Sequence, residues 1–315
     1  MPLAMAARRR ATSLAALAAT LVFVLGACSS GPPTAAPSAV PTLPPATQPA
    51  AATEAPSAAQ VTEAPAPALN GRRISFENGD LALGGMLWKP AGNGPFPSIL
   101  WNHGSELGPG VAGSNPLLGP VFAAEGYVFF MPFRRGQGTS EGTWIVDATN
   151  AAAPADQPAL IAQLHATEQL SDQLAGLAFL RNLAYVDGAR IAVAGWSYGG
   201  IQTVLGAGES AGYRAAVAFT PASQAWAGNT DLQSTMMEAA TGAEIPFLFI
   251  QADNDYSLVP TQELTDAIEA AGGTATRSIY PAFGTTNQDG HEFAVRGSAD
   301  WGAEVFAFLT AAFGG

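Results

Sequence analysis

Three segments of the chain match the pattern Gly-x-Ser-x-Gly, which can present a serine hydroxyl as a nucleophile. They are residues 138–142, 195–199 and 208–212. The chemistry needs a buried strand before the serine and a helix after it, because the sharp turn between them exposes the hydroxyl. Ser197 has this context, since the apolar run 189–194 precedes it and the helix-compatible segment 199–205 follows.

The other two matches stand in the wrong context. Ser210 follows a helix-like stretch and precedes the strand-like segment 215–220, which reverses the required order. Ser140 lies in a polar, glycine-rich segment with no early helix after it. The sequence therefore predicts Ser197 as the nucleophile.

A serine nucleophile needs an imidazole base, and the chain has three histidines. His165 lies inside a helix expected over 158–180, a position where helix packing is the more common role. His103 follows a strand. His291 stands in the polar segment 287–293, which we expect to be a loop between the last strand and the last helix, and it is the predicted base.

The carboxylate that orients the base is expected after the strand 246–251, where Asp253 and Asp255 both occur. Residues two apart on an extended segment face the same side, so spacing alone leaves both open. This Asp-x-Asp pair lacks the glycine and the downstream acid of a calcium loop. We expect neither a metal nor a cofactor.

A tetrahedral intermediate needs two backbone N–H donors for its oxyanion. One is expected from Tyr198, directly after the nucleophile, and the second from Ser105 in the loop 103–106. His103 would then order this loop. The alternative for the loop is a plain turn after a strand.

Further side chains are candidates for substrate binding. Arg134 and Arg135 follow the strand 127–131, and the guanidinium group of one of them could bind a substrate carboxylate through two hydrogen bonds. The alternative is an ion pair that structures the loop. Trp196, beside the nucleophile, is another candidate. Two small insertions are expected at 143–157 and 221–244. Their large apolar side chains either line a pocket or simply pack the insertions: Trp144, Trp226, Met236 and Met237.

The elements that position these residues alternate between strand-like and helix-like segments. This order predicts the α/β class, with a mostly parallel central sheet and helices on both faces. In such a sheet, site residues follow the carboxyl ends of strands. The expected strands are 73–76 and 81–88 as a hairpin, then 97–101, 127–131, 189–194, 215–220, 246–251 and 276–280; the expected helices are 116–124, 158–180, 199–205, 261–271 and 300–312.

The first 27 residues have the pattern of an export signal. Three arginines at 8–10 precede an apolar stretch, 11–25, which is short for a membrane span. Residues 25–28 resemble a bacterial lipobox, so we expect lipid attachment at Cys28 and a location outside the cytoplasm on the cell membrane. The alternatives are an ordinary secretory signal or an N-terminal anchor helix. Cys28 is the only cysteine, so no disulfide can form within the chain.

Residues 28–69 are rich in Pro, Ala and Thr and contain no aromatic residue, so we expect a disordered linker without a core. Residues 70–315 have the length of one catalytic domain. Removal of the leader leaves ten basic and 25 acidic residues. This acidic balance argues against binding to nucleic acid. The sequence does not indicate an oligomeric state.

Several motifs occur together in an order that resembles a known family. They are residues 101–106, 134–142, 195–200, 254–258 and 289–291, and they resemble the dienelactone hydrolase-like branch of the α/β-hydrolases across 70–315. The resemblance implies the α/β-hydrolase fold, with Ser197 as nucleophile, Asp255 as the acid member and His291 as base. It also implies that Ser140 belongs to a loop after the fourth strand.

The expected function is that of a lipid-anchored serine hydrolase that cleaves small-molecule esters as a carboxylesterase. Dienelactone hydrolases proper use cysteine where this chain has Ser197, so we do not expect a dienelactone substrate. The segment 195–200 also resembles the prolyl oligopeptidase catalytic domain, which makes a serine peptidase or amidase the first alternative. A non-catalytic binding module on a hydrolase fold is the second.

Overall fold

A computed structural model describes residues 71–105 and 117–314. The predictions for the signal segment, Cys28 and the linker lie outside the described residues. The described chain forms one eight-stranded sheet in the order β1-β2-β4-β3-β5-β6-β7-β8. Its strands are β1 (Arg72–Asn78), β2 (Leu81–Trp88), β3 (Phe96–Asn102), β4 (Val128–Pro132), β5 (Val186–Trp196), β6 (Ala216–Phe219), β7 (Phe247–Ala252) and β8 (Ala275–Tyr280).

The sheet is mostly parallel, as predicted. β1 pairs with β2 and β2 pairs with β4 in antiparallel fashion, whereas every pair from β4 through β3 to β8 is parallel. The carboxyl ends of the parallel strands therefore meet at one edge. The segments that follow β3, β5, β6, β7 and β8 at that edge carry the candidate site.

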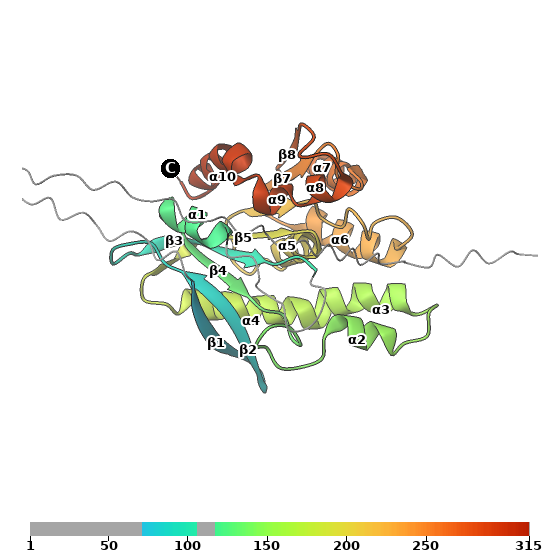
Figure 1. The fold of residues 1–315 in the computed structure, drawn as a ribbon, viewed down its shortest axis with the longest axis horizontal. Coiled ribbons are helices and arrows are strands. Elements are labelled where there is room, and N and C mark those ends of the chain that lie inside the picture. The colour runs from blue at the N-terminus through green and yellow to red at the C-terminus, as the bar shows by residue number, and fades with distance from the viewer. Residues whose placement is uncertain (1–70, 106–116, 315) are drawn as a thin grey trace, which may run out of the picture. The chain divides into compact units, whose positions relative to one another are not determined.

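Helices cover both faces of the sheet, because successive strand residues point to opposite sides. Ile191 and Val193 of β5 pack with α4 to α7, and Ala192 and Ala194 pack with α1, α9 and α10. Figure 1 shows α3 and α4 along one side of the sheet and α1 and α10 on the other. The helices are α1 (Leu118–Ala124), α2 (Ile145–Asn150), α3 (Gln157–Leu164), α4 (Leu170–Arg181), α5 (Tyr198–Gly208), α6 (Thr230–Gly242), α7 (Val259–Ala270), α8 (Asn287–His291), α9 (Phe293–Arg296) and α10 (Ser298–Ala312).

Two local expectations differ from the structure. The helix expected over 158–180 is interrupted by a π-helical turn, η2 (His165–Gln169), between α3 and α4. The segment 287–293, expected to be a polar loop, contains the short helix α8 and the start of α9. α8 forms because Thr286 and Asp289 make a capping box, in which each side chain accepts from the other's backbone N–H.

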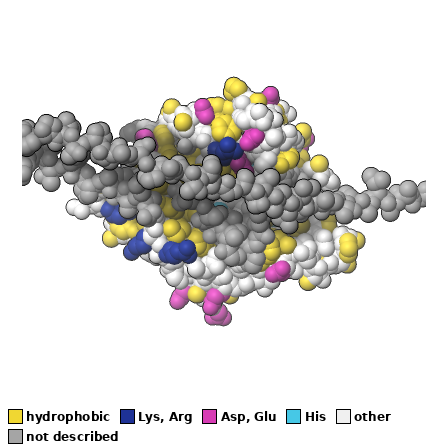
Figure 2. Space-filling view, viewed as in Figure 1, with side chains coloured by type: hydrophobic (Ala, Val, Ile, Leu, Met, Phe, Trp, Pro, Cys, Tyr) yellow, Lys and Arg dark blue, Asp and Glu magenta, His cyan; other side chains and the backbone are white. Residues whose placement is uncertain are grey.

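On the face drawn in Figure 2, acidic side chains stand apart from one another, and Lys and Arg form only small groups.

Within 71–105 and 117–314, no helix combines the length and apolar character that crossing a membrane requires.

Candidate active site

Ser197 lies at a strained turn between β5 and α5. Its backbone has φ 59° and ψ −116°, a conformation that residues other than glycine rarely adopt. The Ser197 N–H donates to the carbonyl oxygen of Phe219 at the end of β6, at 3.0 Å. Such strain persists only where surrounding contacts hold it, and it is typical of functional turns.

The glycines around Ser197 are required by close backbone packing. A Cβ on Gly199 would press on the carbonyl oxygen of Asn102 and lie 2.7 Å from that of His103. A Cβ on Gly200 would lie 2.8 Å from the carbonyl oxygen of Phe219. The first turn of α5 therefore touches the ends of β3 and β6 directly, which only residues without a side chain allow.

The other two Gly-x-Ser-x-Gly serines lie away from this turn. Ser140 donates from Oγ to the Phe133 carbonyl oxygen (2.8 Å) and accepts from the Gly84 N–H (2.9 Å), so it braces the loop after β4. Ser210 follows the end of α5 and precedes β6, the order that the sequence indicates.

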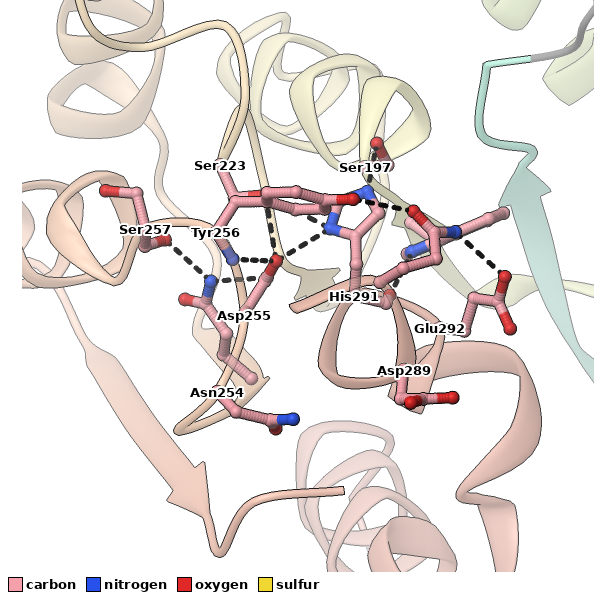
Figure 3. Close-up of polar contacts among 12 residues, drawn as sticks. Ser197, Ser223, Asn254, Asp255, Tyr256, Ser257, Asp289, His291 and Glu292 are labelled. Carbon is pink, nitrogen blue, oxygen red and sulfur yellow. Dashed lines mark hydrogen bonds and ion pairs between the residues drawn. The ribbon is translucent and has the colours of Figure 1, made fainter. Parts of the chain in front are cut away.

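His291 joins Ser197 to Asp255. Its Nε2 lies 2.8 Å from Ser197 Oγ, and its Nδ1 lies 2.9 Å from Asp255 Oδ1. The three side chains point toward one another from three separate segments (Figure 3). The side chain of Asp255 is fully buried and that of His291 is 5% exposed, so water barely competes for the contact between them.

The structure brings Asp255, not Asp253, to His291. Both carboxylate oxygens of Asp255 accept hydrogen bonds: Oδ1 from the Tyr256 N–H and Oδ2 from Gln251 Nε2, each at 2.6 Å. These contacts hold the carboxylate in one orientation. Asp253 is exposed to solvent.

Ser223 is part of the same cluster, and the sequence analysis missed it. Its Oγ lies 3.3 Å from Asp255 Oδ1 and 3.1 Å from His291 Nδ1. The preceding residues Thr220 and Ala222 have φ of 46° and 54°, a strained path that turns Ser223 toward the histidine. Its position just past β6 is the signal that could identify it, whereas the sequence predicts an insertion over 221–244.

Contacts from three sides position His291. Trp196 Nε1 donates to the His291 carbonyl oxygen at 2.7 Å. A Cβ on the preceding Gly290 would lie 2.7 Å from the Asn254 carbonyl carbon, so α8 packs closely on the loop after β7. Hydrogen bonds from Thr286, then the Thr285 N–H and Arg296, lower the pKa of Asp289 to about 2. The capping carboxylate therefore stays ionised to a lower pH than an ordinary aspartate does.

A cavity of about 450 Å³ opens beside Ser197. Both residues expected to form the oxyanion hole, Tyr198 and Ser105, are among those that line it. Tyr198 is the first residue of α5, where a backbone N–H has no partner within the helix. The described lining contains no Asp, Glu, Lys or Arg: Ser105, Ile145, Val146, Thr149, Asn150, Gln157, Ile161, His165, Ser197, Tyr198, Ile201, Ala222, Ser223, Gln224 and Ala225.

The location of Arg134 corrects the expectation that it binds substrate. Arg134 is buried and is not among the residues that line the cavity. Its guanidinium donates to the carbonyl oxygens of His103 (2.6 Å) and Gly104 (2.7 Å), and it lies 4.3 Å from the centre of the Tyr198 ring. Arg134 therefore holds the loop that carries Ser105. Arg135 pairs with Asp172 at 2.8 Å, the loop-structuring alternative.

Trp196 and the large apolar residues of the insertions also lie away from the cavity lining. The Trp196 ring packs on Gly104, where a Cβ would lie 2.6 Å from it, so Trp196 supports the loop and His291 rather than contacting a ligand in this cavity. Both insertions do line the cavity, through other residues such as Ile145 and Ser223. Two of the four large apolar residues are instead buried in the core: Trp226 and Met236. Trp144 and Met237 do not line the cavity either.

The arrangement can perform nucleophilic chemistry at a carbonyl. An imidazole in contact with a serine hydroxyl can accept its proton, and a buried carboxylate on the other ring nitrogen stabilises the charged imidazole that results. Within the described ranges, no group of three or more His, Cys, Asp and Glu side chains is placed to hold a metal ion.

Comparisons with known proteins relate the chain to a protein family and to solved structures. Residues 109–308 match the model of the dienelactone hydrolase family. An acylaminoacyl peptidase of Pyrococcus horikoshii has 20% identity and a TM-score of 0.56, with 76% of this chain and 40% of that chain covered. The Pyrococcus furiosus esterase Pf2001 has 16% identity and a TM-score of 0.56, with 78% and 94% covered.

A putative dienelactone hydrolase from Klebsiella pneumoniae has 21% identity and a TM-score of 0.53, with 77% of this chain and 97% of that chain covered. The chain thus spans about two fifths of the peptidase but nearly all of the esterase and the dienelactone hydrolase. At these identities, the likeness shows the shared fold.

We expect Asp255→Asn to slow covalent modification of Ser197 by a fluorophosphonate about 10³–10⁴-fold, because an amide no longer holds the imidazole in the required tautomer. Asp253→Asn is the matched control, since Asp253 is exposed, and its rate should stay near that of the unmodified protein. The rate is measured by mass spectrometry of the intact protein. Equal slowing in both variants would contradict the assignment.

Proposed function

The chain belongs to the dienelactone hydrolase family, and from this premise we propose that it is a serine hydrolase that cleaves carboxylic esters by acyl transfer. The observation that carries the proposal is the hydrogen-bonded line from Ser197 through His291 to Asp255. This line ends at the wall of a cavity that can hold a small molecule.

In the proposed reaction, His291 Nε2 takes the proton of Ser197 as Oγ attacks the carbonyl carbon of the ester. Asp255 holds the imidazole and stabilises its charge, while the N–H groups of Tyr198 and Ser105 bind the oxyanion. The intermediate collapses as His291 protonates the leaving alcohol. Water, activated by the same histidine, then attacks the acyl-enzyme and frees Ser197.

The cavity supports a neutral, small-molecule ester as substrate. The described lining residues carry no charged side chain, so these residues offer no counter-ion to an ammonium or a carboxylate group of a ligand. The first alternative, a peptidase or amidase, shares the same nucleophile and base. The site geometry alone is compatible with both reactions, because they differ in the leaving group.

The proposal includes attachment to the bacterial cell membrane, outside the cytoplasm, through a lipid on Cys28. The apolar stretch 11–25 and the lipobox-like residues 25–28 support it. The Pro-rich residues 29–69 would then separate the catalytic domain from the membrane.

Ser197→Ala should lower kcat for a short neutral p-nitrophenyl ester about 10⁴–10⁶-fold, because the acyl-enzyme can no longer form. Ser210→Ala removes the same hydroxyl from another Gly-x-Ser-x-Gly segment and should leave kcat within about twofold, as expected of a surface substitution. Both are measured by release of p-nitrophenol. Undiminished hydrolysis by Ser197→Ala would refute Ser197 as the nucleophile, and no hydrolysis by the native protein would favour the non-catalytic alternative.

We expect kcat/KM for neutral esters to exceed that for aminoacyl-prolyl amides with the same chromophore class by at least about tenfold, or 1.4 kcal/mol of barrier. The physical reason is that the described cavity lining has no acidic side chain to hold a substrate ammonium group. Parallel progress curves on both substrates measure the ratio. Comparable values would identify the protein as a peptidase or amidase.

Cys28→Ala should release the full-length protein from the membrane fraction of bacterial cells and abolish incorporation of a fatty-acid analogue, because lipid attachment requires the thiol. Ser29→Ala is the neighbouring control and should remain in the membrane fraction. Cell fractionation and immunoblotting give the distribution. Retention of Cys28→Ala in the membrane would indicate an anchor helix instead.

A further inference from the structure

His165 is a cavity residue with no role in the proposed proton transfer. It begins the π-helical turn between α3 and α4, it is 1% exposed, and it lines the same cavity as Ser197. π-helical turns are rare and often occur at functional sites, because they rotate a side chain away from the ordinary helical register. The turn therefore carries an imidazole side chain among the described residues that line the cavity.

The contacts of Gln202 define which ring nitrogen of His165 carries the proton. Gln202 Nε2 lies 2.8 Å from His165 Nδ1 and 3.1 Å from the His165 carbonyl oxygen. The opposite amide orientation would set two oxygens against each other, so the NH₂ group faces His165 and donates to both atoms. Nδ1 is therefore an acceptor, and the proton of the neutral ring is on Nε2.

The ring is held in place and is uncharged. It packs against the Tyr198 ring, with 4.1 Å between centroids and 35° between the ring planes, and Arg134 lies over the same tyrosine. Burial, and secondly the charge of Arg134, lower the pKa of His165 to about 3. At neutral pH the side chain is thus a neutral donor in a fixed orientation.

The Nε2–H group of His165 is the ring donor to which none of the described hydrogen bonds is made. Among the residues that the structure describes, Gln202 is the only side chain hydrogen-bonded to the ring, and it binds the other nitrogen. A donor on a cavity-lining residue that no described protein group satisfies favours a ligand that accepts from it, and it disfavours a ligand that covers it with carbon. The site therefore selects for an acceptor atom.

We propose that His165 is a specificity-determining residue: its Nε2–H donates a hydrogen bond to an uncharged acceptor oxygen, an ether or a carbonyl, in the part of the ester that fills the cavity. This inference rests on the proposed esterase function and adds the substrate class. The preferred substrates are oxygenated esters, over esters with an all-carbon chain of the same length. A polar site of this kind rejects an analogue that leaves its donor unpaired.

The test compares isosteric esters in which one methylene of the chain is replaced by oxygen. One series varies the acyl chain of p-nitrophenyl esters, and a second varies the alcohol chain with a constant acyl group. For each pair, the ratio of kcat/KM for the oxygenated ester to that for the alkyl ester is measured in wild type and in His165→Phe. Inductive effects of the oxygen on the carbonyl cancel in this comparison between enzymes.

Phe keeps a ring to stack on Tyr198 but removes the donor, so the ratio should fall about tenfold or more for at least one oxygen position. His165→Gln places an amide N–H where Nε2–H was and should recover most of the ratio. An identical ratio in wild type and His165→Phe at every oxygen position would overturn the proposal.

A measurement on the wild-type protein covers the case in which the variants fail to fold. With ¹⁵N-labelled histidine, the Nε2–H resonance of His165 should be present at neutral pH. It should shift further with a phosphonate on Ser197 that carries the oxygenated chain than with its alkyl counterpart. A proton on Nδ1 instead, or equal shifts, would overturn the proposal. Failure of Ser197 to react with either phosphonate would refute the esterase function itself.

Discussion

The close approach of α5 to the ends of β3 and β6 is the constraint on which the site depends. Gly199 lies against the Asn102 and His103 carbonyl groups, and Gly200 lies against that of Phe219. This packing leaves Ser197 no ordinary backbone conformation, and its positive φ is the result. The same contact sets Tyr198 at the start of a helix and the loop with Ser105 beside it, so the proposed nucleophile and the proposed oxyanion donors depend on the same packing.

The second requirement is a buried acid–base pair built from distant parts of the chain. Asp255 follows β7, His291 ends α8 and Ser223 follows β6, and all three meet because parallel strands end at one edge. Each side chain is held by neighbours that do not react: Gln251 and the Tyr256 N–H hold Asp255, and Trp196 holds the backbone of His291. A pair oriented in this way needs little rearrangement during proton transfer.

A series of contacts through Arg134 and Tyr198 connects the loop after β3 to the cavity residue His165. Arg134 donates hydrogen bonds to the His103 and Gly104 carbonyl oxygens and lies over the Tyr198 ring. His165 packs against the same ring. The arginine that we expected to bind substrate therefore acts beneath the site. Its charge also helps to keep His165 neutral, which links the support of the loop to the chemistry of the cavity wall.

Local sequence determined the strand–turn–helix around Ser197, the α/β class and the order of the elements, because apolar runs, glycines and helix signals act over a few residues. The family was confirmed, and Asp255 was implied by the resemblance although spacing left Asp253 open. Tertiary structure alone decided that Asp255 faces His291, that Ser223 joins them and that Arg134 is buried. It also decided that His165, for which the sequence favours a helix-packing role, lines the cavity. These depend on strained loops after β6, on a π-helical turn and on contacts across more than 30 residues, and no local pattern encodes such contacts.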